Sequence, residues 1–395
     1  MKSGAADRVV RFLLSVFGEK YAGFVLLLSG FLLSIPVFFD TVFFLLIPIA
    51  RAMAVRAGGK YLYFVLAMAG AGAITHSMVP PTPGPLMIAE GLGIEVGEAM
   101  VAGIIASILP ACLVLYLAKW FDSKYNFPMR EVAGSSKKSL EIIVNKSDED
   151  LPSVFLSFLP IALPVVLISG LSILNLVRMH YTNFGGLDSG LGVGFFSVLS
   201  FLGEPNMAMA LAAVSSVYIL LKQSIQGNGG KGGRLTSLLS KELEEPLSTA
   251  GMIILITGAG GAFGGMVRLS GVGNSIENLS SELNLSYVLL AWLVTAIIRI
   301  AQGSATVAMI TGVGLMAAVL GDGSVLSYHP LYIFLAIGFG SITLSWMNDS
   351  GFWVVQRLSG FTEKETLKTW SLLLTSISLL GLAICLVGSY LLPLQ

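Results

Sequence analysis

Charged residues are scarce in this chain of 395 residues. Asp, Glu, Lys and Arg make up 12% of it and the mean hydropathy is +0.83, whereas soluble domains carry about 25% charged residues. Acidic and basic residues balance at 23 each, so no net positive field predicts nucleic-acid binding. The two cysteines, Cys112 and Cys385, lie within apolar runs and predict neither a disulfide nor a metal site. The composition therefore predicts an integral membrane protein, and no cofactor is expected.

Prolines are few, but four of the 15 lie within residues 80–85. Each removes a backbone donor and disfavours the helical conformation of the preceding residue, so a helix from Tyr61 must end near Val79. Unpaired backbone groups at membrane depth are tolerated only where they are buried in protein or line a wet cavity. Residues 76–85 are therefore a candidate ligand site if they lie at membrane depth, with an external turn as the alternative.

Two apolar runs are too long for one membrane span and carry polar or helix-breaking residues near their middle. Residues 22–50 contain Pro36 and Asp40, and residues 286–320 contain Arg299 and a polar segment at 302–306. Each arm of the first run has about 14 residues, fewer than the roughly 20 that a helix needs to cross a bilayer. We therefore expect two re-entrant hairpins, with tips at 35–41 and 302–306.

Further helices are predicted at 61–79, 99–117, 151–177, 247–267, 330–347 and 371–394, and Glu204-Pro205 predicts a helix start within the run 190–221. Residues 1–21 predict an amphipathic helix on the cytoplasmic membrane surface. Segments assigned to one side hold 20 of the 23 Lys and Arg residues. By the positive-inside rule, the N-terminus is cytoplasmic and the C-terminus external.

The order of these elements repeats. A hairpin, an interrupted helix and a span occur at 22–119 and again at 286–394, entering from opposite sides, as in inverted-repeat secondary transporters. The expected fold is thus an all-α integral membrane protein, an inverted-repeat secondary transporter with re-entrant hairpins and interrupted helices. We divide it into a surface helix (1–21), an incomplete first repeat (22–119), a cytoplasmic loop (120–150) and a second repeat (151–394). About three spans that would complete the first half are missing from this predicted topology, so a truncation or a shortened relative is expected.

Several segments carry motifs: Ile35-Pro-Val-Phe-Phe-Asp, Val79-Pro-Pro-Thr-Pro-Gly-Pro, Gly258-Ala-Gly-Gly-Ala-Phe, Arg299-Ile-Ala-Gln-Gly-Ser-Ala-Thr, Asn348-Asp-Ser-Gly-Phe-Trp and Lys368-Thr-Trp-Ser. In this order they resemble the gluconate permease (GntP) family of the ion transporter superfamily. The resemblance implies a bacterial inner-membrane importer of gluconate, related sugar acids or small hydroxy acids, coupled to protons. Two positions depart from the family pattern, which usually has His where Thr82 stands and Glu where Asp40 stands.

The carboxylate of an organic acid needs donors or positive charge, and its hydroxyls need mixed donor and acceptor groups. The substrate-binding candidates are Thr41, Thr82, Gly84, Arg299, Ser304, Thr306, Asn348 and Ser350. Ionisable groups within a membrane are costly, so the proton-coupling candidates are Asp40, Asp349 and His76. A structural ion pair for Arg299, a helix cap for Asp349 and a structural hydrogen bond for His76 remain open alternatives.

The predicted function is secondary active import of gluconate or a related acid, with H⁺ as coupling ion and the lipid bilayer as surroundings. The oligomeric state stays open, a homodimer included. One alternative is a truncated remnant that does not transport. Another is an intramembrane hydrolase that uses Ser304 with a histidine, although no nucleophile-elbow pattern supports a catalytic triad.

Overall fold

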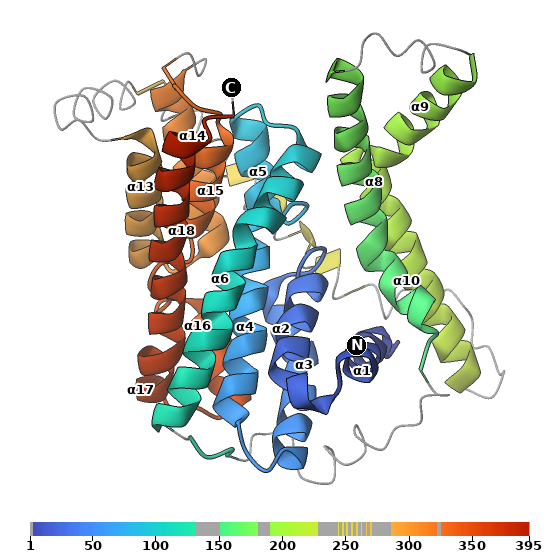
Figure 1. Ribbon diagram of the computed structural model, residues 1–395, viewed down its shortest axis with the longest axis vertical. Helices are drawn as coiled ribbons and strands as arrows, with labels where there is room; N and C mark the ends of the chain where they lie inside the picture. The colour runs from blue at the N-terminus through green and yellow to red at the C-terminus, as the bar shows by residue number, and fades with distance from the viewer. Residues whose placement is uncertain are drawn as a thin grey trace.

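The computed structural model describes residues 3–125, 127–130, 151–180, 190–227, 286–321 and 325–394, with isolated residues between 244 and 270. Within this part of the chain every regular element is a helix (Figure 1). Helical segments long and apolar enough to cross a bilayer are Tyr61–Gly91, Val96–Tyr125, Val154–Leu174, Pro205–Gln223 and Glu363–Leu391. The predicted all-α membrane fold is confirmed.

Two helical hairpins occupy the two long apolar runs and approach each other from opposite ends of the molecule (Figure 1). The first pairs α2 (Ala22–Leu33) with α3 (Phe39–Arg56), and the second pairs α13 (Tyr287–Gln302) with α14 (Ala305–Leu320). The second breaks at Gly303, whose φ of 84° lies in the left-handed region that favours glycine. Both breaks lie at the predicted tips, because proline or glycine stops the helix there.

Two further helices are interrupted. α4 (Tyr61–Met78) stops before the proline cluster, and α5 (Pro83–Gly91) follows it. α15 (Leu331–Gly340) ends seven residues before the predicted Met347, and α16 (Ser350–Ser359) begins after a series of turns. The prediction for α15 was too long, because Ser and Thr hydroxyls can replace intrahelical partners at a helix end. Ser341 Oγ, for example, donates to the carbonyl of Gly338 at 2.7 Å.

Two long helices pack beside the interrupted ones. α6 (Val96–Tyr125) packs along α4, and α18 (Leu372–Leu391) packs along α15. The short α17 (Glu363–Thr366) leads into α18 through a π-helical turn, Leu367–Ser371. α6 continues past its predicted end at residue 117, because the polar residues of its last turns find partners. Asp122 Oδ1 accepts the backbone N–H of Tyr63 at 3.2 Å.

The remaining described helices lie beside the first hairpin. α1 (Ala5–Phe17) packs against α2 and α8 (Val154–His180), and α9 (Gly190–Gly203) precedes α10 (Pro205–Gly227). The predicted start of α10 is confirmed, since Glu204 accepts the N–H of Met207 at 3.0 Å. Residues 131–150 of the predicted loop 120–150, residues 271–285 and most of the glycine run at 258–265 lie outside the described residues.

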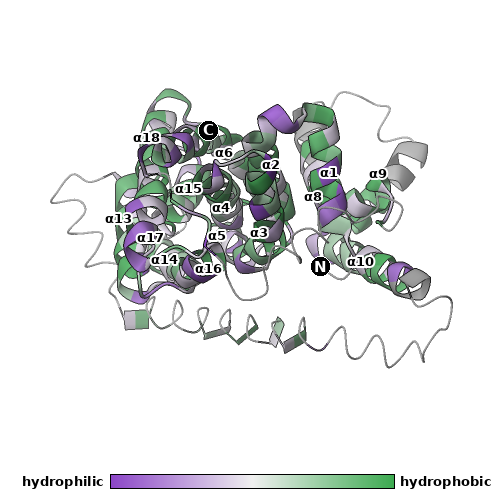
Figure 2. Cartoon of the chain, turned by 90° about the horizontal axis from the view of Figure 1, so that it is seen from below, coloured by the Kyte–Doolittle hydropathy of each residue, from purple (hydrophilic) through white to green (hydrophobic). Residues whose placement is uncertain are grey.

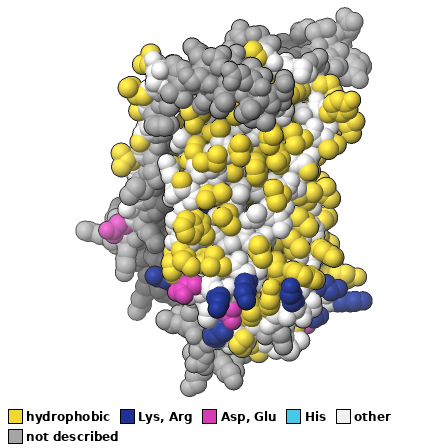
Figure 3. Space-filling view, turned by 90° about the vertical axis from the view of Figure 1, so that its left-hand side faces the viewer, with side chains coloured by type: hydrophobic (Ala, Val, Ile, Leu, Met, Phe, Trp, Pro, Cys, Tyr) yellow, Lys and Arg dark blue, Asp and Glu magenta, His cyan; other side chains and the backbone are white. Residues whose placement is uncertain are grey.

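Seen from below, α4, α5 and α15 lie between the two hairpins, and α8, α9 and α10 stand to the side of α1 (Figure 2). Figure 3 shows Lys and Arg side chains gathered at the lower end of one face, with apolar side chains above them. α17 and the end of α6 lie at that lower end (Figure 1) and carry Lys364 and Lys124 in their last turns. This distribution suits a protein whose apolar middle lies in a bilayer.

Candidate functional site

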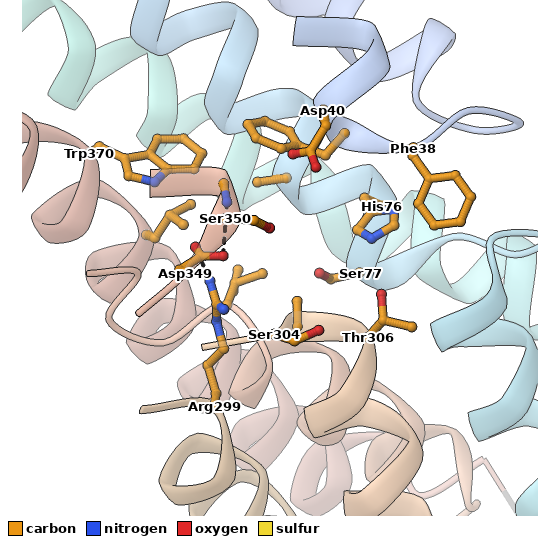
Figure 4. A pocket seen from close by; sticks show the side chains of 16 residues that line it. Phe38, Asp40, His76, Ser77, Arg299, Ser304, Thr306, Asp349, Ser350 and Trp370 are labelled. Atoms are coloured by element: carbon orange, nitrogen blue, oxygen red, sulfur yellow. Dashed lines mark hydrogen bonds and ion pairs between the residues drawn. The ribbon is translucent and has the colours of Figure 1, made fainter. Parts of the chain in front are cut away.

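The hairpin tips and the interrupted helices meet at one pocket of about 130 Å³ (Figure 4). Both hairpins, the last turn of α4, the start of α16 and the π-helical turn contribute to its wall. The lining residues are Phe38, Phe39, Asp40, Ala73, His76, Ser77, Arg299, Ser304, Ala305, Thr306, Ile342, Asp349, Ser350, Gly351, Trp370 and Leu374. Segments about 300 residues apart in the sequence therefore form one site.

Three helices begin in the wall of the pocket: α3, α14 and α16. The first N–H groups of a helix lack intrahelical partners, and the helix dipole places partial positive charge at this end. Ser304 caps α14 by accepting the N–H of Val307 at 3.3 Å. Asp349 caps α16 by accepting the N–H of Gly351 at 3.0 Å. The N-termini of α3 and α16 already carry the carboxyl groups of Asp40 and Asp349, whereas the first turn of α14 contains no acid and therefore favours an anionic ligand.

A buried ion pair crosses the pocket wall. Arg299 Nη2 lies 2.5 Å from Asp349 Oδ2, and the two residues are only 3% and 6% exposed. Arg299 also donates to the carbonyl of Gly303 at the tip of the second hairpin. Arg299 thus makes an ion pair and Asp349 caps a helix, which were the structural alternatives for these two residues. Together they join the second hairpin tip to the break before α16.

Side chains behind Asp349 hold its carboxylate in place. Ser345 Oγ donates to Asp349 Oδ2, and Trp370 Nε1 donates to Ser345 Oγ at 2.9 Å. The Trp370 ring stacks on Phe39 of the first hairpin, with ring centroids 5.5 Å apart and an interplanar angle of 17°. The π-helical turn therefore presents an indole that contacts both the first hairpin and the segment before α16.

Asp40 differs from Asp349 in its surroundings. It lies in the first turn of α3 and lines the same pocket. None of the described residues gives its side chain a hydrogen bond or an ion pair, and its side chain is exposed. The pocket thus contains one acid that is held by a cation and one that is not.

The structure brings seven of the predicted site residues together at this pocket: Asp40, His76, Arg299, Ser304, Thr306, Asp349 and Ser350. Four others lie outside its lining: Thr41, Thr82, Gly84 and Asn348. Only the first part of the proline-rich stretch therefore reaches the pocket, through His76 and its neighbour Ser77.

Three of the outlying residues have structural contacts instead. Thr82 Oγ1 donates to the carbonyls of His76 and Val79, both at 3.0 Å, and so closes the end of α4. A Cβ at Gly84 would lie 2.2 Å from Met309 Cε, so α5 packs closely on α14 there. Asn348 Nδ2 donates to the carbonyl of Ile300 at 2.7 Å, near the end of α13.

The sequence did not predict Ser77, Phe38, Phe39 or Trp370 as site residues, although Ser77 lies in the predicted stretch 76–85 and Phe38 and Phe39 lie in the predicted tip 35–41. Trp370 lies in the Lys368-Thr-Trp-Ser motif, and Phe38 and Phe39 lie in the first hairpin motif. Ser77 follows His76 directly. A search of the residues beside each helix break could have found all four, but no property of their side chains alone marks them.

Comparison with known proteins identifies the family to which this chain belongs. The family model described as GntP family permease matches residues 1–391. The chain belongs to the GntP permease family. A permease of Haemophilus influenzae is 35% identical over 93% of this chain and 73% of its own length. The gluconate permease of Pseudomonas aeruginosa is 32% identical over 98% and 80%, and the high-affinity gluconate transporter of Escherichia coli is 32% identical over 97% and 81%.

This GntP permease is a multi-pass membrane transporter and not an enzyme. The hydrolase alternative is therefore wrong. Ser304, its candidate nucleophile, caps a helix instead. The pocket of this transporter is lined by residues from both hairpins and from the breaks of the interrupted helices.

Proposed function

We propose that this permease imports gluconate or a closely related sugar acid by proton symport across the bacterial inner membrane. The observation that carries the proposal is the pocket in whose wall α14 begins, because its helix N-terminus contains no acid and suits a carboxylate. The names of the Pseudomonas and Escherichia relatives support gluconate as the first substrate to test.

In this proposal the substrate carboxylate lies against the first turn of α14. Ala305 and Thr306 line the pocket there, and neither residue is charged. Arg299 adds positive charge nearby, although its ion pair with Asp349 balances most of it. The backbone groups of the hairpin tip, rather than the guanidinium, are thus the main anion-binding groups.

Asp40 is the proposed carrier of the coupling proton. It is the pocket acid without a described partner, whereas Asp349 is held by Arg299, Ser345 and a backbone N–H. A carboxyl group that can bind a proton on one side and release it on the other is what a symporter needs, and such groups in membranes are typically functional. His76 is assigned to substrate recognition instead.

The proposed orientation has the basic end of the molecule in the cytoplasm. Figure 3 shows Lys and Arg at that end, and the C-terminus lies at the opposite end (Figure 1). The positive-inside rule then places the C-terminus outside. The division into a surface helix, two repeats and a cytoplasmic loop is part of the same proposal.

Uptake into proteoliposomes tests the function. The purified chain should accumulate radiolabelled gluconate when the vesicle interior is more alkaline than the medium, and a protonophore should abolish the accumulation. Equal uptake with and without a pH gradient would overturn proton coupling. A folded protein that takes up no sugar acid under any gradient would favour the remnant that does not transport.

A further inference from the structure

His76 and Ser77 form the wall of the pocket opposite the Arg299–Asp349 pair (Figure 4). They lie in the last turn of α4 and are 8% and 1% exposed. Within the described residues, neither His76 Nδ1 nor Ser77 Oγ has a hydrogen-bond partner. A buried polar atom without a partner is destabilising, so a ligand that bonds to these two atoms would gain affinity.

Ser77 differs from neighbouring helical hydroxyls in lacking a partner, although Ser34 and Ser359 also have buried hydroxyls without one among the described residues. Two residues earlier on the same helix, Thr75 Oγ1 donates to the carbonyl of Ala71 at 3.0 Å. Ser107 on α6 likewise donates to the carbonyl of Gly103 at 2.6 Å. Ser77 is just as buried but makes no such bond, and its side chain points into the pocket (Figure 4).

We propose that Ser77 and His76 recognise a hydroxyl group of the substrate, so that this permease selects polyhydroxy acids over simple carboxylates. The inference rests on the proposed sugar-acid transport and assigns one part of its pocket. A hydroxyl donates one hydrogen bond and accepts up to two, as does Ser77, and a neutral imidazole offers one donor and one acceptor nitrogen. A substrate hydroxyl can therefore satisfy both buried atoms whichever imidazole nitrogen carries the proton, whereas a carboxylate oxygen, being only an acceptor, can do so only when Nδ1 is protonated.

The position of the pair also fits an elongated acid. The N-termini of α14 and α16 lie on the Ser304 and Ser350 sides of the pocket, and His76 and Ser77 lie across from the ion pair (Figure 4). The imidazole packs on the Phe38 ring, with centroids 5.5 Å apart. A carboxylate at the N-terminus of α14 therefore leaves the hydroxyl-bearing chain to reach His76 and Ser77.

Selectivity follows from this geometry. A site built to bond a substrate hydroxyl rejects the analogue that lacks it, because the buried protein groups then stay unpaired. The test measures how well gluconate and its monodeoxy analogues, each lacking one hydroxyl, compete with radiolabelled gluconate for uptake into proteoliposomes. In the unmodified protein, at least one monodeoxy analogue should compete roughly tenfold more weakly than gluconate.

Ser77→Ala should reduce that ratio to within about twofold. Gluconate should compete more weakly in this variant, and the deoxy analogue should compete as well as it does in the unmodified protein. Ser107→Ala is the matched control, since it removes a buried serine hydroxyl outside the pocket and should keep the ratio. His76→Asn, which retains a polar atom near the position of Nδ1, should keep more discrimination than His76→Leu. Thermal unfolding without substrate should leave Ser77→Ala at least as stable as the unmodified protein, because the deleted hydroxyl has no partner there.

An unchanged ratio in Ser77→Ala would overturn the inference. So would an equal loss of affinity for gluconate and for every analogue, or discrimination by His76→Leu equal to that of the unmodified protein. Absence of uptake by the unmodified protein is a separate result that would overturn the proposed function. If Ser77→Ala does not yield folded protein, Ser77→Cys is measured in its place. Its ratio of competition by gluconate to competition by the deoxy analogue is then compared with that of the unmodified protein.

Discussion

Arg299 of the second hairpin and Asp349 before α16 form a buried ion pair with 2.5 Å between Nη2 and Oδ2, although 50 residues separate them in the sequence. Each also binds backbone beside its own helix break, Arg299 at Gly303 and Asp349 at Gly351. The pair therefore joins the break between α13 and α14 to the break before α16, and both residues line the pocket.

Removal of either charge should destabilise the protein more than removal of both. Arg299→Gln leaves Asp349 buried without a cation, and breaking one side of a buried pair costs about 3–5 kcal/mol. The double variant Arg299→Gln with Asp349→Asn should recover a large part of this loss. Thermal unfolding of the detergent-solubilised variants measures it, with Arg357→Gln, on the exposed side of α16, as control. Additive losses would contradict a coupled pair.

Asp40→Asn should retain the exchange of gluconate across the membrane but lose the proton-driven accumulation of gluconate. An asparagine keeps the size of the side chain but cannot carry a proton, so gluconate counterflow should persist while accumulation driven by a pH gradient is lost. Glu90→Gln, an exposed acid on α5 outside the pocket, is the control and should transport normally. Retained proton-driven accumulation in Asp40→Asn would remove Asp40 from the coupling role.

Gly303→Ala should reduce stability and uptake together. Its φ of 84° disfavours a side chain, and a Cβ there would lie 2.1 Å from the carbonyl oxygen of Asn348. Gly58→Ala separates the two effects, because Gly58 has a φ of 64° but a Cβ added there would meet no atom within 4 Å. Gly58→Ala should cost only the conformational term of about 1–2 kcal/mol. An equal loss in both variants would show that the contact with Asn348 is unimportant.

Thr82→Val should lower stability without changing substrate selection. The hydroxyl donates to two carbonyls at the end of α4 and does not line the pocket, and a hydrogen bond contributes about 0.5–1.5 kcal/mol. Thr82→Ser should restore the bonds. The measurements are the unfolding temperature and the competition ratios among sugar acids. A shift in those ratios, with stability unchanged, would argue for a direct role in binding.

The positions of the helix breaks could be predicted because they follow from local chemistry. Pro36, the prolines after Val79 and the Gly303-Ser304 pair each stop a helix by means visible in the sequence. The end of α15 could not be predicted in this way, since apolar residues continue through Trp346 and Met347 after the helix has stopped.

The residue types of the candidate site could be predicted from the sequence. The hydrogen-bond and ion-pair partners of those residues could be predicted only in part. Arg299, Asp349 and Asp40 were recognisable as costly residues in apolar sequence. Arg299 binds Asp349, whereas Asp40 has no described partner, and this difference depends on how the hairpins and the interrupted helices pack. Thr82 and Ser77 illustrate the same limit: two hydroxyls five residues apart have opposite surroundings, one bonded to carbonyls and one unpaired in the pocket.

The position of the two hairpin tips determines where the membrane potential falls within the protein. Because both tips end inside the fold, water that reaches the pocket from either side leaves only a thin layer of protein to separate the two solutions. The membrane potential then falls across that layer instead of the full bilayer, and one elementary charge that crosses 100 mV gains about 2.3 kcal/mol. A rearrangement of a few ångströms at the tips would thus move a charge on Asp40 or on a bound anion through most of the voltage.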